Sequence, residues 1–262
     1  MVFKDHIKEY WQSQGQTHEN SHWASWGDNW MIDLEIENIS NHINEGDHVL
    51  DIGCANGHGT IRQTQLKRVG SITGVDFAES MITAAKSAAH AQKLTDTVTF
   101  LEGDVRQLEF PDATFDLAYT TRVLINLPSW EQQLLGISEC LRVVKPGGAV
   151  IFSESFWEPL MRLNALRTVV GLPALTEHDY NRYLKRSKLE AYLAAAGLDY
   201  QIDDFSSVYY LGSRFLRELV TDPSAYPGYS NPINEIFHGL EKRFSGGGMG
   251  VQQAVVIRKG AK

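Results

Sequence analysis

Between His48 and Ser153, short apolar segments that end in Gly or Asp alternate with segments of helical periodicity. This alternation constrains the fold most strongly, because a strand, a helix and a second strand in succession place both strands parallel in one sheet. Strands are predicted near 48–52, 71–76, 98–102, 115–120 and 149–153, and helices near 57–69, 79–92 and 129–143. The sequence therefore predicts an α/β fold with a doubly wound, mostly parallel sheet.

The alternation stops after Phe156. A helix is expected at 188–196, and strands at 200–207 and 252–258 have no clear crossover helix between them. We interpret these two strands as an antiparallel end to a seven-stranded sheet, the last strand running against the others. The stretches at about 156–185 and 208–250 carry aromatic residues, Pro and Gly, and we expect them to be irregular insertions that cover a substrate.

Residues 1–46 are predicted to form a helical lid. Amphipathic helices are expected at 2–14 and 28–43, joined by a polar stretch. Four of the six Trp residues lie in this segment, at positions 11, 23, 26 and 30. Two short helices cannot bury that much aromatic surface between themselves, so we expect the lid to pack on a single core domain at 47–262, a division in keeping with the length of 262 residues.

Composition excludes several classes of protein. The chain has 24 Lys+Arg against 32 Asp+Glu, and a net charge of −8 argues against nucleic acid as a partner. No apolar run approaches the roughly 18 residues that span a bilayer, and the first residues lack a secretion signal, so we expect a cytoplasmic protein without a membrane partner. Cys54 and Cys140 form no CxxC pair, and no acid cluster completes the spacing of His18 and His22, so no metal site is predicted.

The most informative stretch runs from Val49 to Gly59 and reads VLDIGCANGHG. A strand ends in Asp51 and turns through glycines into a helix, which lets a ligand approach the backbone closely. A dinucleotide fingerprint would need glycine at Ala55 and His58. Asp51 would also repel a diphosphate, whereas a carboxylate suits a ligand that carries an ammonium and a sulfonium group.

Together with three further stretches, this turn resembles the class I S-adenosylmethionine-dependent methyltransferases, in particular a type 11-like small-molecule subgroup, over about residues 47–155. The further stretches are GVDFAESM at 74–81, GDV at 103–105 and LRVVKPGG at 141–148. The departures from the family pattern, at Ala55, Asn56 and His58, are mild. The resemblance implies a Rossmann-like fold and S-adenosylmethionine as the cofactor.

The resemblance also implies roles for single residues. Asp76 would hold the ribose hydroxyls, Asp104 would face the adenine amino group, and Val105 would offer its backbone amide. Thr121 at the end of the fourth strand would pass beneath the methionine part. The expected cofactor-binding residues are Asp51, Gly53, Cys54, Asn56, Gly57, Asp76, Phe77, Asp104, Val105 and Thr121. The structural alternative is that Asp51 and Asp76 only cap helices or turns.

With such a cofactor, the main catalytic task is to align a small acceptor and exclude water. A hydroxyl acceptor also needs a general base, whereas an amine need only arrive neutral, and both acceptor types remain open. The candidate bases are Glu154, His178 and His22. A loop cap or salt bridge is the alternative for Glu154, and an ordinary hydrogen-bonded side chain is the alternative for each His. Tyr209, Tyr210, Tyr226, Tyr229, Arg214 and Arg217 are interpreted as acceptor-pocket wall.

Two other functions stay open at this point. A non-catalytic module could keep the cofactor site for regulation or assembly, because fold does not decide function. A nicotinamide dehydrogenase would instead predict NAD binding and a wholly parallel sheet, which the last two strands argue against. The aromatic residues of the lid segments leave a homodimer open. Our leading hypothesis is methyl transfer to an oxygen or nitrogen of a small metabolite, such as a sugar or a specialised metabolite.

Overall fold

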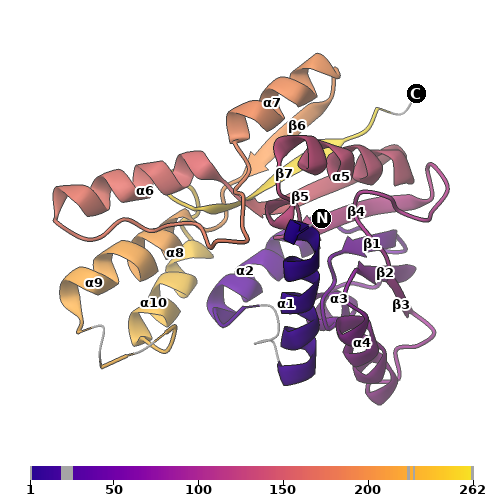
Figure 1. Ribbon diagram of the computed structural model, residues 1–262, viewed down its shortest axis with the longest axis horizontal. Helices are drawn as coiled ribbons and strands as arrows, with labels where there is room; N and C mark the ends of the chain where they lie inside the picture. The colour runs from indigo at the N-terminus through magenta and orange to yellow at the C-terminus, as the bar shows by residue number, and fades with distance from the viewer. Residues whose placement is uncertain (1, 19–25, 223–224, 227, 261–262) are drawn as a thin grey trace.

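The computed structural model describes residues 2–18, 26–222, 225–226 and 228–260. Its centre is a seven-stranded sheet with the order β3-β2-β1-β4-β5-β7-β6 (Figure 1). The strands are β1 (His48–Ile52), β2 (Ser71–Asp76), β3 (Val98–Glu102), β4 (Phe115–Thr121), β5 (Val144–Ser155), β6 (Asp199–Asp203) and β7 (Gln252–Arg258). The first five strands run parallel, and β7 is antiparallel to both β5 and β6. The predicted fold class is confirmed.

Strand β5 begins five residues earlier than expected. The bend at Lys145-Pro146-Gly147-Gly148 was predicted to precede the strand, but it lies within it. Gly147 has a φ of 80°, and a Cβ on Gly148 would lie 2.5 Å from the carbonyl oxygen of Asp116 on β4. Glycine at both positions therefore lets the strand bend while it stays paired with its neighbour.

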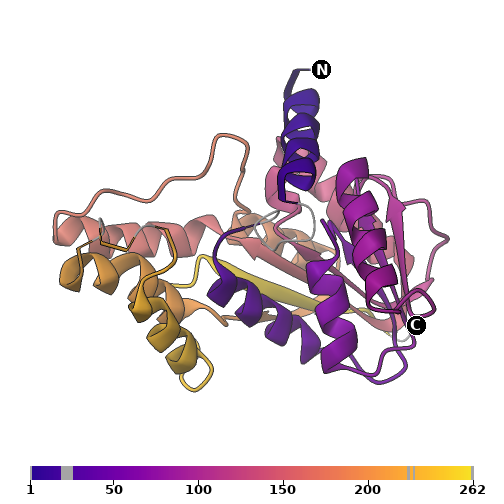
Figure 2. The same ribbon diagram turned by 90° about the horizontal axis from the view of Figure 1, so that it is seen from below.

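Alternate side chains of the central strands enter two hydrophobic layers. Leu50 and Ile52 share one layer with α5 (Trp130–Val143) and α7 (Arg186–Ala195). Val49 points to the opposite layer, which contains α2 (Asn29–Ser40) and α6 (Trp157–Val169). Helices α3 (His58–Leu66) and α4 (Glu79–Ala91) complete the cover beside β1, β2 and β3 (Figure 2). Both faces of the sheet are thus covered, as a parallel sheet requires.

The sections at 156–185 and 208–250 were both expected to be irregular, and this expectation was wrong for both. Helix α6 lies in the first section. The second section, at 208–250, is also largely helical. It contains α8 (Ser207–Leu211), a π-helical turn η3 (Gly212–Leu216), α9 (Arg217–Val220) and α10 (Pro232–Glu241). Together with α6, these elements form a helical lobe that extends beyond the carboxyl ends of the strands (Figure 1). Buried Arg167 of α6 joins the two parts of the lobe, because its guanidinium donates two 3.0 Å hydrogen bonds to Glu218. The helices here depend on such long-range contacts.

The strand predicted at 200–207 ends at Asp203 instead. Ser206 and Ser207 begin the turn into α8, where the Ser206 hydroxyl donates to the carbonyl of Gln252. The Ser207 hydroxyl accepts the amides of Met249 and Gly250 at 2.9 and 2.8 Å. These hydroxyls thus pair with backbone groups at 249–252, at the start of β7, which lie outside the residues of β7 that pair with β6.

The N-terminal segment has two distinct environments. Helix α1 (Val2–His18) lies along α4, where the Gln12 side chain accepts a 3.0 Å hydrogen bond from the amide of Ser80. Helix α2 is capped by Asp28 and packs Met31 and Leu34 directly into the sheet core. The division at residue 46 stays a prediction, and Trp23 lies outside the described residues.

Across the part of the chain described here, no helix combines the length and the apolar character needed to cross a membrane. Cys54 and Cys140 are both buried free thiols.

Candidate functional site

A cavity of about 410 Å³ lies at the carboxyl ends of β1, β2 and β4. Strand order reverses here, because β1 has β2 on one side and β4 on the other, and ligands of open α/β sheets bind at such a point. The cavity includes side chains of α1, α2 and the loop at 171–185, and it reaches residues of the helical lobe such as Tyr210 and Arg214. Segments far apart in the sequence therefore line one cavity.

Nine of the ten residues predicted to bind a cofactor line this cavity, namely Asp51, Gly53, Cys54, Asn56, Asp76, Phe77, Asp104, Val105 and Thr121. Gly57 is the remaining one. It precedes α3 with a φ of 79°, and a Cβ there would lie 2.7 Å from Cζ of Phe100. Glycine at this position serves the packing of the turn and does not line the cavity wall.

The turn after β1 is tightly constrained at Gly53. Its φ is 76°, its amide donates to the carbonyl of Val75, and a Cβ would lie 2.1 Å from Cγ2 of Val123. Only glycine fits this conformation and this space. The backbone is therefore exposed to a ligand at close range between the ends of β1 and β4.

Two buried carboxylates flank this turn. Asp76 accepts hydrogen bonds from the amides of Ala55 and Ala78 at 3.0 and 2.9 Å, and Asp51 accepts one from the hydroxyl of Thr60 at 2.6 Å. Burial raises the pKa of each carboxyl to about 6, against the effect of these hydrogen bonds. A ligand with positive charge and hydroxyl donors would stabilise the ionised forms.

The donor set fits the implied cofactor. Asp51 and Asp76 present carboxylates suited to an ammonium group and a ribose diol, and Gly53 of the turn lines the cavity beside them. The same carboxylates would repel a diphosphate. Asp104 accepts hydrogen bonds from the Arg106 amide and Nε at 2.9 and 2.8 Å, so part of its capacity is used, and its contact with adenine stays a prediction.

Glu154, the first candidate base, is fully buried and is absent from the lining among the described residues. Its carboxylate accepts the hydroxyl of Thr120 at 2.7 Å and the amides of Val123, Leu124 and Ile125 at 3.0 to 3.3 Å. Burial raises its pKa to about 7. This geometry is that of the loop-cap alternative, since the carboxylate holds the turn that follows β4.

The two candidate histidines differ in what can be said of them. His178 lines the cavity, and its ring stacks on that of Tyr180 with centroids 5.5 Å apart. Tyr180 in turn stacks on Tyr10 of α1 at 4.8 Å, so α1 and the loop at 171–185 meet over the cavity. His22 lies outside the described residues. The catalytic roles of both stay predictions.

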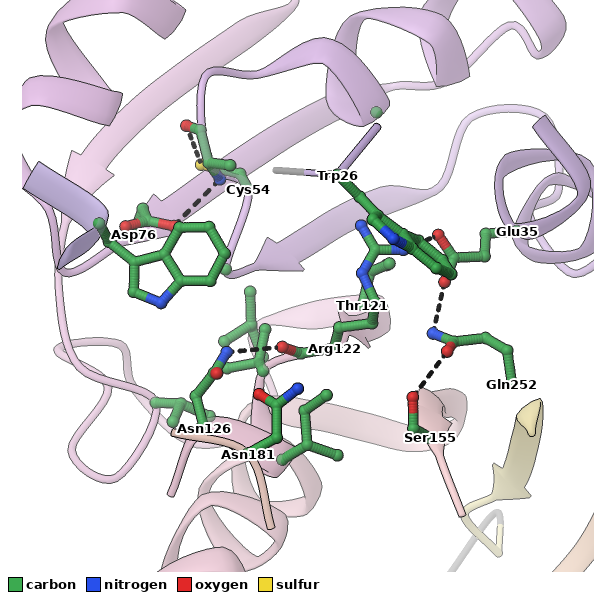
Figure 3. A pocket seen from close by; sticks show the side chains of 18 of the residues that line it. Trp26, Glu35, Cys54, Asp76, Thr121, Arg122, Asn126, Ser155, Asn181 and Gln252 are labelled. Atoms are coloured by element: carbon green, nitrogen blue, oxygen red, sulfur yellow. Dashed lines mark hydrogen bonds and ion pairs between the residues drawn. The ribbon is translucent and has the colours of Figure 1, made fainter. Parts of the chain in front are cut away.

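One polar network in the cavity wall was missed by sequence reasoning (Figure 3). Arg122 forms an ion pair with buried Glu35, and its guanidinium lies 4.8 Å from the ring centre of Trp26. The Gln252 side chain donates to Glu35 and accepts a 2.8 Å hydrogen bond from the hydroxyl of Ser155. These residues come from four separate segments, so no local motif could reveal them.

A second buried cluster lies at the lobe side. Asp28 accepts from the hydroxyl of Tyr209 at 2.6 Å and from Nη2 of Arg214 at 2.5 Å. The Arg214 guanidinium lies 4.8 Å from the ring centre of Tyr229, whose hydroxyl accepts the indole N–H of Trp26 at 3.1 Å. Of the six predicted wall residues, Tyr210, Tyr229 and Arg214 line the cavity, whereas Tyr209, Tyr226 and Arg217 do not.

Within the described residues, no three His, Cys, Asp or Glu side chains gather as metal ligands would.

Comparison with known proteins identifies the central segment. Residues 49–148 match the family model of a methyltransferase domain. A ubiquinone biosynthesis O-methyltransferase of Coxiella burnetii is 29% identical over 169 residues, which cover 63% of this chain and 68% of that protein. A 27-O-demethylrifamycin SV methyltransferase of Amycolatopsis mediterranei is 30% identical over 155 residues, covering 55% and 54%.

Solved structures share the whole architecture at low identity. The [4+2]-cyclase SpnF superimposes with a TM-score of 0.59 at 23% identity, covering 88% of this chain and 82% of its own. The geranyl diphosphate C-methyltransferase of Streptomyces coelicolor A3(2) superimposes with a TM-score of 0.58 at 16% identity, covering 86% and 77%. At such identities the likeness establishes the fold alone.

Proposed function

We propose that the chain is a class I S-adenosylmethionine-dependent methyltransferase, and that it transfers the methyl group to an oxygen or nitrogen of a small metabolite. The observation that carries the proposal is the single cavity that joins the acidic, glycine-lined strand ends to an aromatic, polar wall. One part suits the cofactor, and the other is left for the acceptor. Two of the relatives are named for oxygen acceptors, which supports an oxygen acceptor here.

The cofactor supplies an activated methyl group, so the protein must orient the acceptor and exclude water. The stacked rings of Tyr10, Tyr180 and His178 cover the cavity from α1 and the loop at 171–185. Trp26 and Tyr229 close it from the lobe side. A concave cavity of about 410 Å³ lined by aromatic rings suits a small molecule better than a polymer.

The proposed cofactor contacts are made by residues that line the cavity. Asp76 binds the ribose hydroxyls, Asp51 faces the ammonium group, and the backbone near Thr121 and Val105 contacts the methionine and adenine parts. The lid at 1–46 and the insertions at 156–185 and 208–250 then form the part of the cavity that binds the acceptor. The two free thiols support a reducing compartment such as the cytoplasm as the place of action.

The test is transfer of a labelled methyl group. The purified protein is incubated with methyl-labelled S-adenosylmethionine and a mixture of small hydroxy and amino compounds, and products are analysed by mass spectrometry. A labelled product and an equal amount of S-adenosylhomocysteine are expected, and Asp76→Ala should lower both. Binding of the cofactor without any product would favour the non-catalytic binding module instead.

A further inference from the structure

Glu35 is a buried carboxylate in the cavity wall to which the cofactor site gives no role. It belongs to α2, its side chain is 2% exposed, and it lines the same cavity as Asp51 and Thr121. Its two oxygens accept hydrogen bonds from Arg122 and Gln252, which leaves each oxygen a further lone pair (Figure 3). A carboxylate with spare acceptor capacity therefore faces the cavity.

Arg122 links Glu35 to the end of β4, where the methionine part of the cofactor is expected. Arg122 directly follows Thr121 and has a φ of 56°, a left-handed conformation that is uncommon for a residue with a side chain. Its amide donates to the carbonyl of Ser153 at 2.9 Å, and its carbonyl accepts the side chain of Asn126 at 2.8 Å. The turn is thus fixed from both sides, and the guanidinium pairs with Glu35.

The acceptor part of the cavity is balanced in charge. Arg122 is paired with Glu35, and Arg214 is paired with Asp28. Since neither guanidinium is left without a counter-charge, an anionic acceptor would gain little here. The flat rings of Trp26, Tyr210 and Tyr229 line the same part, and such rings favour a planar ligand.

Two of the buried polar atoms of the lining that lack a hydrogen-bond partner add a requirement for hydrogen bonds. Among the described residues, neither Oδ1 of Asn126 nor Nη1 of Arg214 has a hydrogen-bond partner. One is an acceptor and the other is a donor, and both belong to residues that line the cavity. Because buried polar groups are normally paired, a ligand with polar substituents would satisfy them.

We propose that the acceptor is an uncharged, ring-containing hydroxyl compound, and that Glu35 accepts the proton of its hydroxyl group. The acceptor oxygen forms a bond to the methyl carbon while the carbon–sulfur bond breaks, and the sulfur keeps that electron pair. The hydroxyl proton passes to the carboxylate of Glu35, so the charges balance. This proposal rests on the proposed function and decides between its two acceptor atoms in favour of oxygen.

The surroundings of Glu35 agree with this role. Burial raises the pKa of its carboxyl, whereas Arg122 and the hydrogen bond from Gln252 lower it and the charge of nearby Asp28 raises it further. Tyr210 of α8 also faces this group. A raised pKa makes a carboxylate a better proton acceptor. Arg122 beside it would also stabilise negative charge that develops on the acceptor oxygen.

The first experiment measures the charge preference of the site. With S-adenosylhomocysteine present, the protein is titrated calorimetrically with 4-methylphenol, 4-methylbenzoate and 4-methylbenzylammonium. The wild type should bind the phenol about tenfold or more tightly than either ion. Glu35→Gln removes the counter-charge of Arg122, so it should bind the benzoate more tightly and the phenol more weakly. Glu37→Gln, on the same helix but paired at the surface with Lys242, should match the wild type.

The second experiment measures turnover with a set of neutral phenols. Glu35→Gln should lower kcat about 100-fold or more and remove the fall of kcat at acidic pH, since a general base contributes about 10²- to 10⁴-fold. Glu35→Asp keeps a carboxylate and should recover part of the rate. Three results would overturn the proposal. They are a change of KM alone in Glu35→Gln, tighter binding of either ion than of the phenol by the wild type, and a wild type that neither binds nor methylates any phenol. Loss of S-adenosylhomocysteine binding by the wild type would instead count against the proposed function.

Discussion

Asp76 and Glu154 are acids at the carboxyl ends of β2 and β5, and both are buried, yet their surroundings differ. The carboxylate of Asp76 accepts two amides and still faces the cavity. That of Glu154 accepts one hydroxyl and three amides of the neighbouring turn. Residue type and strand position predict a carboxylate at the edge, but the direction of the side chain depends on the turns beside it.

The shared pKa of about 6 for Asp51 and Asp76 predicts a pH dependence of binding. Asp51 must be ionised to attract the ammonium group, and Asp76 must be ionised to accept both ribose hydroxyls, so affinity for S-adenosylmethionine should fall as pH falls through about 6. Asp76→Asn should reduce this dependence, and the part due to Asp51 should remain. Calorimetric titration over a pH series measures it, and an affinity that is constant across this range would contradict the assignment.

The same pKa shifts make the stability of the cofactor-free protein depend on pH in the opposite direction to cofactor affinity. Burial raises these pKa values above those of the unfolded chain, so the folded state binds more protons between the two values. These two groups therefore stabilise the cofactor-free fold progressively as pH falls from above about 6 towards about 4. Comparing the pH dependence of the free energy of unfolding in the wild type and in Asp76→Asn isolates the contribution of Asp76. This pH dependence should be smaller in the variant.

At the scale of elements, the turn after β4 depends on Glu154. Glu154→Ala would leave three buried amides without their acceptor, and we expect a loss of about 3 kcal/mol or more in the free energy of unfolding. Glu154→Gln keeps one oxygen and should lose less. Glu109→Ala, at an exposed loop position, serves as the control in denaturant-induced unfolding.

The opposite result would restore the other interpretation of Glu154. If Glu154→Ala kept the stability of the wild type but abolished methyl transfer, Glu154 would act in catalysis and not as a cap.

The π-helical turn η3 allows a second prediction. A Cβ on Gly212 would lie 1.9 Å from Cγ of Phe237 on α10, so Gly212→Ala should destabilise the fold by about 1 to 3 kcal/mol. Gly239 lies within α10 and faces open space, so Gly239→Ala should stabilise by up to about 1 kcal/mol. Equal effects of the two substitutions on the free energy of unfolding would contradict the close packing of η3 against α10.

The parts of the fold predictable from sequence are those fixed by local pattern. The strands from His48 to Ser153 were predictable because apolar runs and glycine turns are patterns that extend over only a few residues. Helices α8 and α9 were missed because they are very short and depend on distant contacts such as Arg167 with Glu218. Periodicity over four or five residues cannot reveal a helix of that kind.

The same distinction applies to the site. Asp51, Asp76 and Asp104 each follow a strand within a recognisable motif, so their shared place at the sheet edge was predictable. Glu35 and Arg122 lie 87 positions apart and pair only in the folded chain. The acceptor part of the cavity therefore became visible only with the structure.

At the scale of the whole molecule, the central claim is that the strand edge binds an adenosyl cofactor beneath a cover from three segments. Calorimetric titration of the purified protein with S-adenosylmethionine, S-adenosylhomocysteine and NAD, repeated with Asp76→Ala, tests this claim most directly. We predict binding of both adenosyl ligands but not of NAD, weakened in the variant by about 1 to 3 kcal/mol. Absence of adenosyl binding, or binding that Asp76→Ala leaves unchanged, would contradict the account.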